Sequence, residues 1–372
     1  MAVTNGYIPK RELGIDLFKV FAMFLVVVLH VFWHGMREMV DAWNLKTAMP
    51  SSINDYVLFM FRAAACCCVN CFALATGYIA IKITYRWQRI VILWLQVVTI
   101  GLICVLAFKL ISPYTGMKIS SRYFGDALKP VSCATYWYFT AYVGLFALMP
   151  MINAAIKALD VRHFKLSVLA MLGVFSLLPT IVGIDVFDSM LGFSAWWLAI
   201  CYIIGAYARL TNLPERVTAK RAWLIVAGAW LFTCIASLAM FKHKHVFLNY
   251  ISLNVIIMSV AWLVLFAKIR SENWFVVWLA KLSPYTFGVY LIHENPFVKG
   301  ELLNRFLWIR SLNPVLSIVS VLVISAAIFL ISASIDYLRA RLFEILKVRQ
   351  GVDKLAGKVN AMIDAGASKS ER

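Results

Sequence analysis

Residues 14–30 read GIDLFKVFAMFLVVVLH, an apolar run of about the length that crosses the hydrocarbon core of a bilayer. Asp16 and Lys19 lie near its start, and His30 closes it. Ionisable side chains are costly at membrane depth, and they usually face a protein interior or a water-filled cavity. The stretch therefore predicts a transmembrane helix that carries a functional face.

Apolar runs of this kind recur along the whole chain. Of its 372 residues, 62% are hydrophobic and 15% are charged, whereas soluble domains carry roughly 25% charged residues. We therefore predict an all-α polytopic integral membrane protein with about ten transmembrane helices. They lie at roughly 15–34, 54–81, 88–111, 134–156, 166–184, 194–210, 221–241, 249–267, 275–298 and 314–338. Because Lys281 and Pro284 interrupt the ninth, that helix is expected to begin at Pro284, with 274–280 along the membrane interface.

The net charge of +18 has an ordinary explanation in a membrane protein. Lys and Arg are concentrated on the predicted loops that share a side with both termini, which places the termini in the cytoplasm of a multi-pass cell-membrane protein. We see no nucleic-acid-binding module and expect no nucleic-acid partner. Residues 1–338 form the predicted membrane domain. Residues 339–372 form a basic tail, either an amphipathic helix on the anionic inner leaflet or a solvated segment.

Asp16, Lys19 and His30 are spaced to share one face of the first helix. Eleven residues separate Lys19 from His30, which is about three helical turns, or roughly 16 Å along the axis. Asp16 is three residues before Lys19, so the two can pair. Histidine suits proton transfer near neutral pH, although a packed histidine bonded to a backbone group is the alternative interpretation.

The second and third predicted helices add cationic side chains. Arg62 falls in the outer half of the membrane, at the level of His30, unless it reaches to the interface instead. Arg86 and Arg89 lie at the inner start of the third helix, close to Lys82. Guanidinium clusters bind phosphates well, so these residues can hold an anionic cytosolic cofactor, or they can simply set the topology.

Cysteines predict no metal site. Cys68 and Cys71 form a Cys-x-x-Cys pair, but no second pair stands at zinc spacing. We interpret the buried cysteines as small residues at helix contacts.

Five short motifs in order resemble the membrane-bound acyltransferase family 3. The first is Asp16, Lys19 and His30, with Lys where the family usually has Arg. Residues 71–78, CFALATGY, resemble the end of the family's second helix, and Arg86 and Arg89 match its Arg-x-x-Arg pair. Trp137 and Tyr138 match an aromatic pair, and residues 283–296, SPYTFGVYLIHENP, resemble its Tyr-Leu-x-His helix, with His293 at the histidine. The variants at 19, 62 and 76 look most like the branch that acts on surface polysaccharides.

The resemblance implies an enzyme that moves an acyl group, usually acetyl, from cytosolic acyl-CoA to a hydroxyl of an extracytoplasmic or lipid-linked glycan. It implies His30 as general base or transient acyl carrier, with Asp16 and Lys19 along the donor channel. Arg62 and His293 are candidate catalytic residues. The donor-binding candidates are Lys82, Arg86, Arg89 and Tyr78, and the acceptor-binding candidates are Trp137 and Tyr138. The alternative is a transporter or flippase of a glycan-related substrate that catalyses no reaction. The oligomeric state is not predicted.

Overall fold

The computed structural model describes residues 12–44, 49–116, 120, 122–240 and 246–370. Helices and their connections account for this part of the chain, which contains no strand, so the predicted all-α fold is confirmed. The α-helices are α1 (Leu13–His30), α2 (Arg37–Asn44), α3 (Ile53–Ala65), α4 (Cys68–Ala80), α5 (Gln88–Thr115), α6 (Arg122–Leu128), α7 (Trp137–Ala158), α8 (Val161–Leu172), α9 (Leu178–Val182), α10 (Ala195–Leu210), α11 (Leu213–Arg216), α12 (Ala219–Ala239), α13 (Leu253–Ala267), α14 (Trp274–Ala280), α15 (Thr286–His293), α16 (Pro314–Ile345) and α17 (Val348–Ser370). The π- and 3₁₀-helical segments are η1 (Val31–Gly35), η2 (Gly173–Leu177), η3 (Met190–Gly192), η4 (Val246–Leu248), η5 (Ser283–Tyr285), η6 (Val298–Leu302) and η7 (Leu307–Ser311).

Within the described residues, 9 helical stretches are long and apolar enough to cross a membrane, which confirms the polytopic architecture. They are Leu13–Gly35, Ile53–Ala80, Gln88–Tyr114, Trp137–Ala158, Val161–Val182, Ala219–Ala239, Val246–Ala267, Trp274–His293 and Pro314–Ile345. The remaining predicted span, 194–210, is the sixth in chain order and corresponds to α10. Its 16 residues extend only about 24 Å, which is less than the hydrocarbon thickness. It is buried among other helices, and Trp197 and Tyr202 are fully enclosed.

Glycines let α4 and α10 pack backbone against backbone. A Cβ atom on Gly77 would overlap the carbonyl oxygen of Tyr202, and one on Gly205 would overlap that of Leu74. Small residues are the usual means by which transmembrane helices approach this closely. The crossing also determines where Tyr78, the next residue after Gly77, is held.

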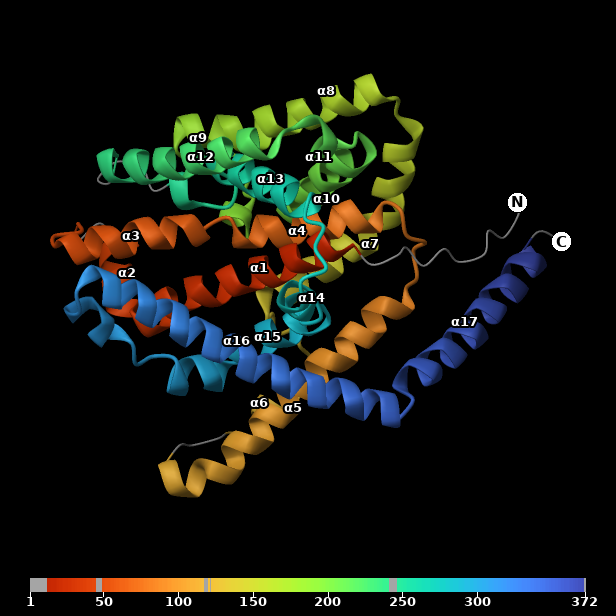
Figure 1. Cartoon of the computed structure of the whole chain (residues 1–372). Coiled ribbons are helices and arrows are strands. Elements are labelled where there is room, and N and C mark those ends of the chain that lie inside the picture. Colours follow the sequence, from red (N-terminus) through yellow and green to blue (C-terminus); the bar gives the residue numbers. More distant parts are fainter. Residues whose placement is uncertain (1–11, 45–48, 117–119, 121, 241–245, 371–372) are drawn as a thin grey trace.

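Helix α1 lies in the middle of the bundle, where it contacts α3, α4, α13, α14, α15 and α16 (Figure 1). Phe18 and Val27 are fully buried, and Asp16 is 9% exposed. Helices at the outside of the bundle, such as α12, instead expose apolar side chains. Leu224, Ile235 and many others are largely exposed. Such a surface fits lipid, whereas the ionisable groups of α1 face protein.

The predicted ninth segment is broken near Pro284. Helix α14 ends at Ala280, η5 includes the proline, and α15 starts at Thr286. Proline cannot donate the backbone hydrogen bond that a continuing helix needs. In Figure 1 α14 is seen nearly end-on, whereas α1 runs across the view. Helix α15 packs on α1, which brings His293 at its end toward α1.

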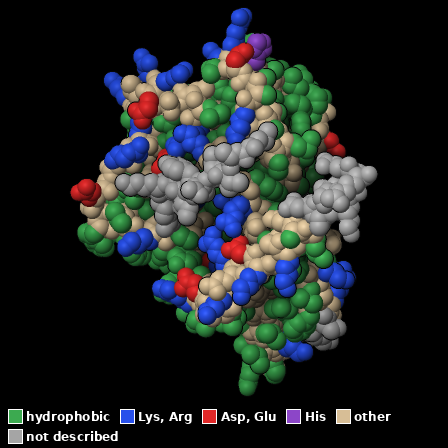
Figure 2. All heavy atoms as spheres, turned by 90° about the vertical axis from the view of Figure 1, so that its right-hand side faces the viewer, with side chains coloured by type: hydrophobic (Ala, Val, Ile, Leu, Met, Phe, Trp, Pro, Cys, Tyr) green, Lys and Arg blue, Asp and Glu red, His purple; other side chains and the backbone are tan. Residues whose placement is uncertain are grey.

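The C-terminal segment is helical, and α16 continues past position 338 to Ile345 without a break. Helix α17 packs along the start of α5, with Val352 and Ala356 buried. A guanidinium nitrogen of Arg86 lies 3.1 Å from a carboxylate oxygen of Asp353. Figure 1 shows α17 leading away from the bundle, and Figure 2 shows many Lys and Arg side chains on this end of the molecule.

Candidate active site

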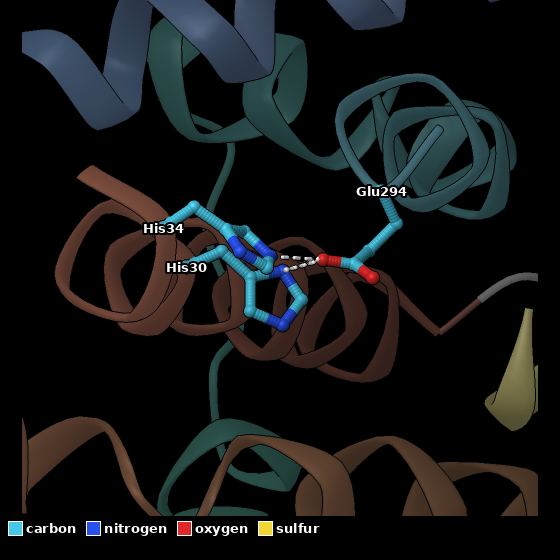
Figure 3. A group of neighbouring side chains, drawn as sticks. All are labelled: His30, His34 and Glu294. Carbon is cyan, nitrogen blue, oxygen red and sulfur yellow. Dashed lines mark hydrogen bonds and ion pairs between the residues drawn. The ribbon is translucent and has the colours of Figure 1, made fainter. Parts of the chain in front are cut away.

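His30 at the end of α1 and His34 in η1 both reach one carboxylate oxygen (Figure 3). The Nδ1 atom of His30 lies 3.3 Å from Oε1 of Glu294, and Nε2 of His34 lies 2.6 Å from the same oxygen. The π-helical segment η1 follows His30 directly, and Glu294 follows the last residue of α15. Single π-helical turns within longer helices are frequent at functional sites. This group lies where the first and the predicted ninth membrane segments meet.

A chain of hydrogen bonds sets the proton positions on His293 and His30. Nδ1 of His293 lies 2.6 Å from the carbonyl oxygen of Val289, which can only accept, so this nitrogen carries the proton. In the neutral ring, Nε2 of His293 is then an acceptor, and it lies 2.8 Å from Nδ1 of His30. His30 therefore donates from Nδ1, which leaves a lone pair on its Nε2 atom. A neutral histidine in this tautomer can accept a proton at Nε2.

Glu294 is anionic and is held from both sides. Its Oε2 atom accepts from Nζ of Lys299 at 3.2 Å, while Oε1 meets the two histidines. The carboxylate accepts from His34 and Lys299 and lies 3.3 Å from Nδ1 of His30, and these surroundings favour its ionised form. The carboxylate can therefore stabilise positive charge on His30.

A cavity of about 210 Å³ opens beside these groups. His30, His34, Glu294 and Lys299 line one part of it, and the remaining wall is largely aromatic. The aromatic residues are Trp33, Phe72, Trp137, Tyr138, Phe193, Tyr250, Phe287 and Tyr290. The backbone N–H of Tyr138 donates to the hydroxyl of Tyr290 at 3.2 Å, which ties the predicted aromatic pair to α15. The structure thus brings His30, His293, Trp137 and Tyr138 together at one site.

Arg62 lines a neighbouring cavity of about 290 Å³ and not the first one. The two cavities share Leu29, Trp33, Phe193 and Tyr250 in their walls. The side chain of Arg62 is 6% exposed, and its guanidinium carbon lies 6.0 Å from the centre of the Trp33 ring. Arg62 is therefore close to the His30 site and separated from it by Trp33.

The other end of α1 borders a third cavity, of about 240 Å³. Oδ1 of Asp16 accepts from the Ser283 hydroxyl at 2.9 Å and lies 3.9 Å from Nζ of Lys19. Both residues line this cavity, and so do Tyr78 and Lys82. Arg209 from α10 joins them, with its guanidinium 4.7 Å from the centre of the Tyr78 ring and paired with Glu12. Three cations, Lys19, Lys82 and Arg209, thus converge on one hollow.

Arg86 and Arg89 line none of these three cavities. Arg86 is instead paired with Asp353 of α17, and its side chain is 48% exposed. Arg89, on the first turn of α5, interacts electrostatically with Arg86 and with Arg349 of α17. The predicted Arg-x-x-Arg pair therefore forms a separate basic group at the surface, completed by the tail helix.

His30, His34 and Glu294 are also residues of the kind that bind zinc. Ligand atoms around a tetrahedral zinc ion lie roughly 3.4 Å apart, given zinc–ligand distances near 2.1 Å. The 2.6 Å separation of His34 and Glu294 is a hydrogen-bond length, and Lys299 neutralises the carboxylate from its other side. The geometry favours a proton network over a metal centre.

The sequence alone predicts no role for His34, Glu294, Lys299 or Arg209. A weak signal existed for two of them, since His34 is four residues after His30 and Glu294 directly follows His293. Arg209 stands at the end of an apolar run, where a basic residue is normally interpreted as a topology signal. Only the packing of α10 on α4 brings it to Tyr78.

A family model described as "Acyltransferase domain", that of acyltransferase family 3, matches residues 12–337 of the chain. No curated protein and no solved structure shows detectable similarity to it. The matched region includes α1 and its histidines, both cavities that contain His30 or Arg62, and α15 with Glu294.

Proposed function

Because this chain belongs to acyltransferase family 3 and is a multi-pass membrane acyltransferase, we propose that it transfers an acetyl group from cytosolic acetyl-CoA to a glycan hydroxyl. The acceptor is an extracytoplasmic or lipid-linked glycan, and the enzyme is an O-acetyltransferase of the cell membrane. The observation that carries this proposal is the hydrogen-bond chain from Val289 through His293 to His30, which leaves Nε2 of His30 free to act as a base.

His30 acts as the general base in this proposal. Its Nε2 atom takes the proton of the acceptor hydroxyl while the hydroxyl oxygen bonds to the thioester carbonyl carbon. The carbon–sulfur bond then breaks, and His30 returns the proton to the CoA sulfur, which yields the ester and free CoA. Glu294, 3.3 Å from Nδ1 of His30, stabilises the imidazolium between these two events.

The donor binds at the opposite end of α1. Lys19, Lys82 and Arg209 supply positive charge for the CoA diphosphate in a hollow that Tyr78, Asp16 and Glu12 also line, and the diphosphate replaces the two carboxylates as the partner of the cations. Arg86 and Arg89, which form the separate basic group with the tail helix, serve the remaining phosphate of CoA in this proposal. The gathering of Lys and Arg side chains at this end supports placing it, with both termini, in the cytoplasm (Figure 2).

The thioester end of acetyl-CoA has only a short distance to cross between the donor cavity and the His30 cavity. Met23 and Phe287 line the His30 cavity, while Lys19 and Pro284 line the donor cavity. Lys19 and Met23 are four residues apart along α1, and Pro284 and Phe287 are three residues apart along η5 and α15. Each separation amounts to roughly 6 Å or less along the helix axis. The two cavities share no lining residue, so side chains separate them. Met23 is unbranched and adaptable, and its movement opens the route in our proposal.

The acceptor lies in the aromatic cavity at the His30 end. Trp137 and Tyr138 offer faces for sugar rings, and they line the same cavity as His30 and His34. A cytosolic donor and an external acceptor thus meet on one helix, which explains why α1 is polar at both ends.

Acetyl transfer by the purified full-length protein in lipid nanodiscs tests this function. Acetyl-CoA consumption is followed together with the mass of acetylated surface glycans from cells that express each variant. We expect His30→Ala to abolish transfer, whereas His163→Ala, which removes an exposed histidine paired with Asp160, leaves it unchanged. Full transfer by the His30 variant would remove the proposed chemistry. Acetyl-His30 in a digest of the stalled enzyme would replace general-base catalysis by a covalent route.

A further inference from the structure

An apolar groove of about 290 Å³ lies between α8, α10, α12 and α13. Of the described residues that line it, all are apolar except Tyr207. The groove shares no lining residue with the cavities of His30, Arg62 or Asp16. The chemistry proposed above therefore gives it no role.

The groove has about the depth of one leaflet. Along α13 its wall runs from Ile256 to Val264, which is about 12 Å, and half of the hydrocarbon core is about 15 Å. Val264 lies on the last turn of α13 and Ala222 on the first turn of α12, so one end of the groove is near the membrane surface. Leu169 and Ile225 in its wall are 52% and 41% exposed, so the groove is open toward lipid.

Two basic side chains extend past this end of the groove. Lys165 is one turn before Val168 and Leu169 on α8, and Arg221 is one turn before Ile225 on α12. Residues three or four apart share one face of a helix, and helical side chains lean toward the N-terminus. Both cations therefore project from the groove toward the membrane surface at which α8 and α12 begin.

The surroundings of this end are positive overall. Residues 160–165 and 213–221 carry three further exposed cations, Arg162, Arg216 and Lys220, and two carboxylates, Asp160 and Glu215. Asp160 is paired with His163. With Lys165 and Arg221, the cations of these two segments outnumber the carboxylates, so the rim attracts anions.

An anionic phospholipid matches both parts of this surface. Apolar walls at membrane depth suit an acyl chain, whereas an α-helix with its side chains is roughly 10–12 Å across and too wide for the groove. Lys and Arg at a membrane surface attract anionic lipids, and both bind phosphate oxygens. A zwitterionic headgroup also carries an ammonium group, which such a rim repels.

We propose that the groove binds an acyl chain of an anionic phospholipid, with the headgroup phosphate between Lys165 and Arg221. The lipid joins α8 to α12 and α13 in the leaflet at which α8 and α12 begin. Helix α10 contributes Ile204 and Tyr207 to the groove and carries Arg209 of the donor cavity. The bound lipid therefore supports the helix that holds Arg209. The inference goes beyond the proposed function and does not depend on acyl transfer.

Lipid binding to the full-length protein in detergent tests the proposal, with native mass spectrometry to count bound lipids and measure dissociation constants. The probes are dioleoyl phosphatidylglycerol and dioleoyl phosphatidylcholine, which have the same chains and differ in headgroup charge. The proteins are the wild type, Lys165→Gln/Arg221→Gln, Val260→Phe and Lys129→Gln/Arg37→Gln. Val260 is a partly exposed wall residue, so a larger ring fills the groove. Lys129 and Arg37 are exposed cations on other segments, and their variant is the control with a matched change of charge.

The wild type is expected to bind phosphatidylglycerol at least about tenfold more tightly than phosphatidylcholine. Lys165→Gln/Arg221→Gln should lose this preference while its affinity for phosphatidylcholine stays unchanged. Val260→Phe should weaken the binding of both lipids, because the added ring occupies the space of the chain. Lys129→Gln/Arg37→Gln should behave as the wild type.

Equal affinity of the wild type for the two lipids would overturn the inference, and so would unchanged lipid binding by Val260→Phe. A wild-type dimer that Val260→Phe dissociates would assign the groove to a second copy of the chain instead. A phosphatidylglycerol with a diazirine on its acyl chain locates the lipid on the wild type, so the test stands even where a variant does not fold. Cross-links are expected on peptides of α8, α12 and α13, and cross-links confined to other helices would also overturn the inference. None of these measurements requires acyl transfer, so their outcome is separate from that of the proposed function.

Discussion

The Nε2 atom of His293 lies 2.8 Å from the Nδ1 atom of His30, although 263 positions separate the two in the chain. This contact joins the first and the predicted ninth membrane segments at the place where a carboxylate and an aromatic cavity also meet. In the proposed mechanism, His293 orients His30 and fixes its proton through this contact.

Replacing His293 with Leu should lower kcat for acetyl transfer by roughly two to three orders of magnitude, because Nδ1 of His30 loses its acceptor and the tautomer is no longer fixed. His293→Gln should restore part of the rate, since its amide oxygen can accept the same hydrogen bond. The measurement is steady-state acetylation, with His163→Leu as the control. A His293→Leu enzyme within twofold of the wild type would contradict the proposed orientation.

Replacing Glu294 with Gln should lower kcat by about one to two orders of magnitude, because the imidazolium of His30 loses its counter-charge while the side chain keeps its size. The acid side of the pH–rate profile should also move to lower pH, since the protonated form of the base is less stabilised. A pH–rate series checks both effects. A reduced rate with an unmoved profile would assign Glu294 a packing role only.

Glu294 should also make folding stability depend on pH. His34 and Lys299 hold its ionised carboxylate in the folded protein, so its stabilising contribution is present above the unfolded carboxyl pKa of about 4.3 and is lost as the pH falls further. The wild type should therefore unfold at higher temperature than Glu294→Gln at pH 7, and the difference should shrink below about pH 4. Thermal unfolding of both proteins across this range is the measurement. A constant difference would mean that the carboxylate is not ionised by its partners.

Arg209 and Arg86 should affect donor binding differently. Arg209→Ala should weaken binding of CoA and of dephospho-CoA equally, by roughly tenfold or more, because it lines the cavity assigned to the diphosphate. Arg86→Ala should weaken CoA alone and bring its affinity toward that of dephospho-CoA, which lacks the outer phosphate. Calorimetric titration of both ligands distinguishes them. If Arg86→Ala weakened both ligands and Arg209→Ala neither, the two sites would have to be exchanged.

Arg310 should matter for stability rather than for activity. Its Nε and Nη2 atoms lie 2.7 and 2.8 Å from the carboxylate of Asp55, whose side chain is completely buried. Arg310→Ala leaves that carboxylate under-satisfied and should cost about 1–3 kcal/mol. Arg37→Ala breaks an exposed ion pair with Asp41 and should change little. Thermal unfolding of the two variants provides the comparison, and equal shifts would argue against a structural role for Arg310.

Much of the fold follows from local sequence. Backbone polar groups inside a bilayer must bond within their own segment, so apolar runs of about 20 residues become helices with little ambiguity. Pro284 marks the break between α14 and α15 for the same local reason. The short helix α10 does not follow this rule of length. Its burial depends instead on the close packing that Gly77 and Gly205 allow.

For the candidate site too, local sequence predicts some features and tertiary packing determines the others. The sequence by itself determined that this chain spans a membrane in several helices and that Asp16, Lys19 and His30 share one face of the first, because helical periodicity is a local property. Only the tertiary structure decided which residues contact that face and the other candidate site residues. Glu294 contacts His30, Arg209 contacts Tyr78, and Asp353 pairs with Arg86. Those partners come from helices far away in the chain, and packing between helices, which no local pattern encodes, determines where their side chains end.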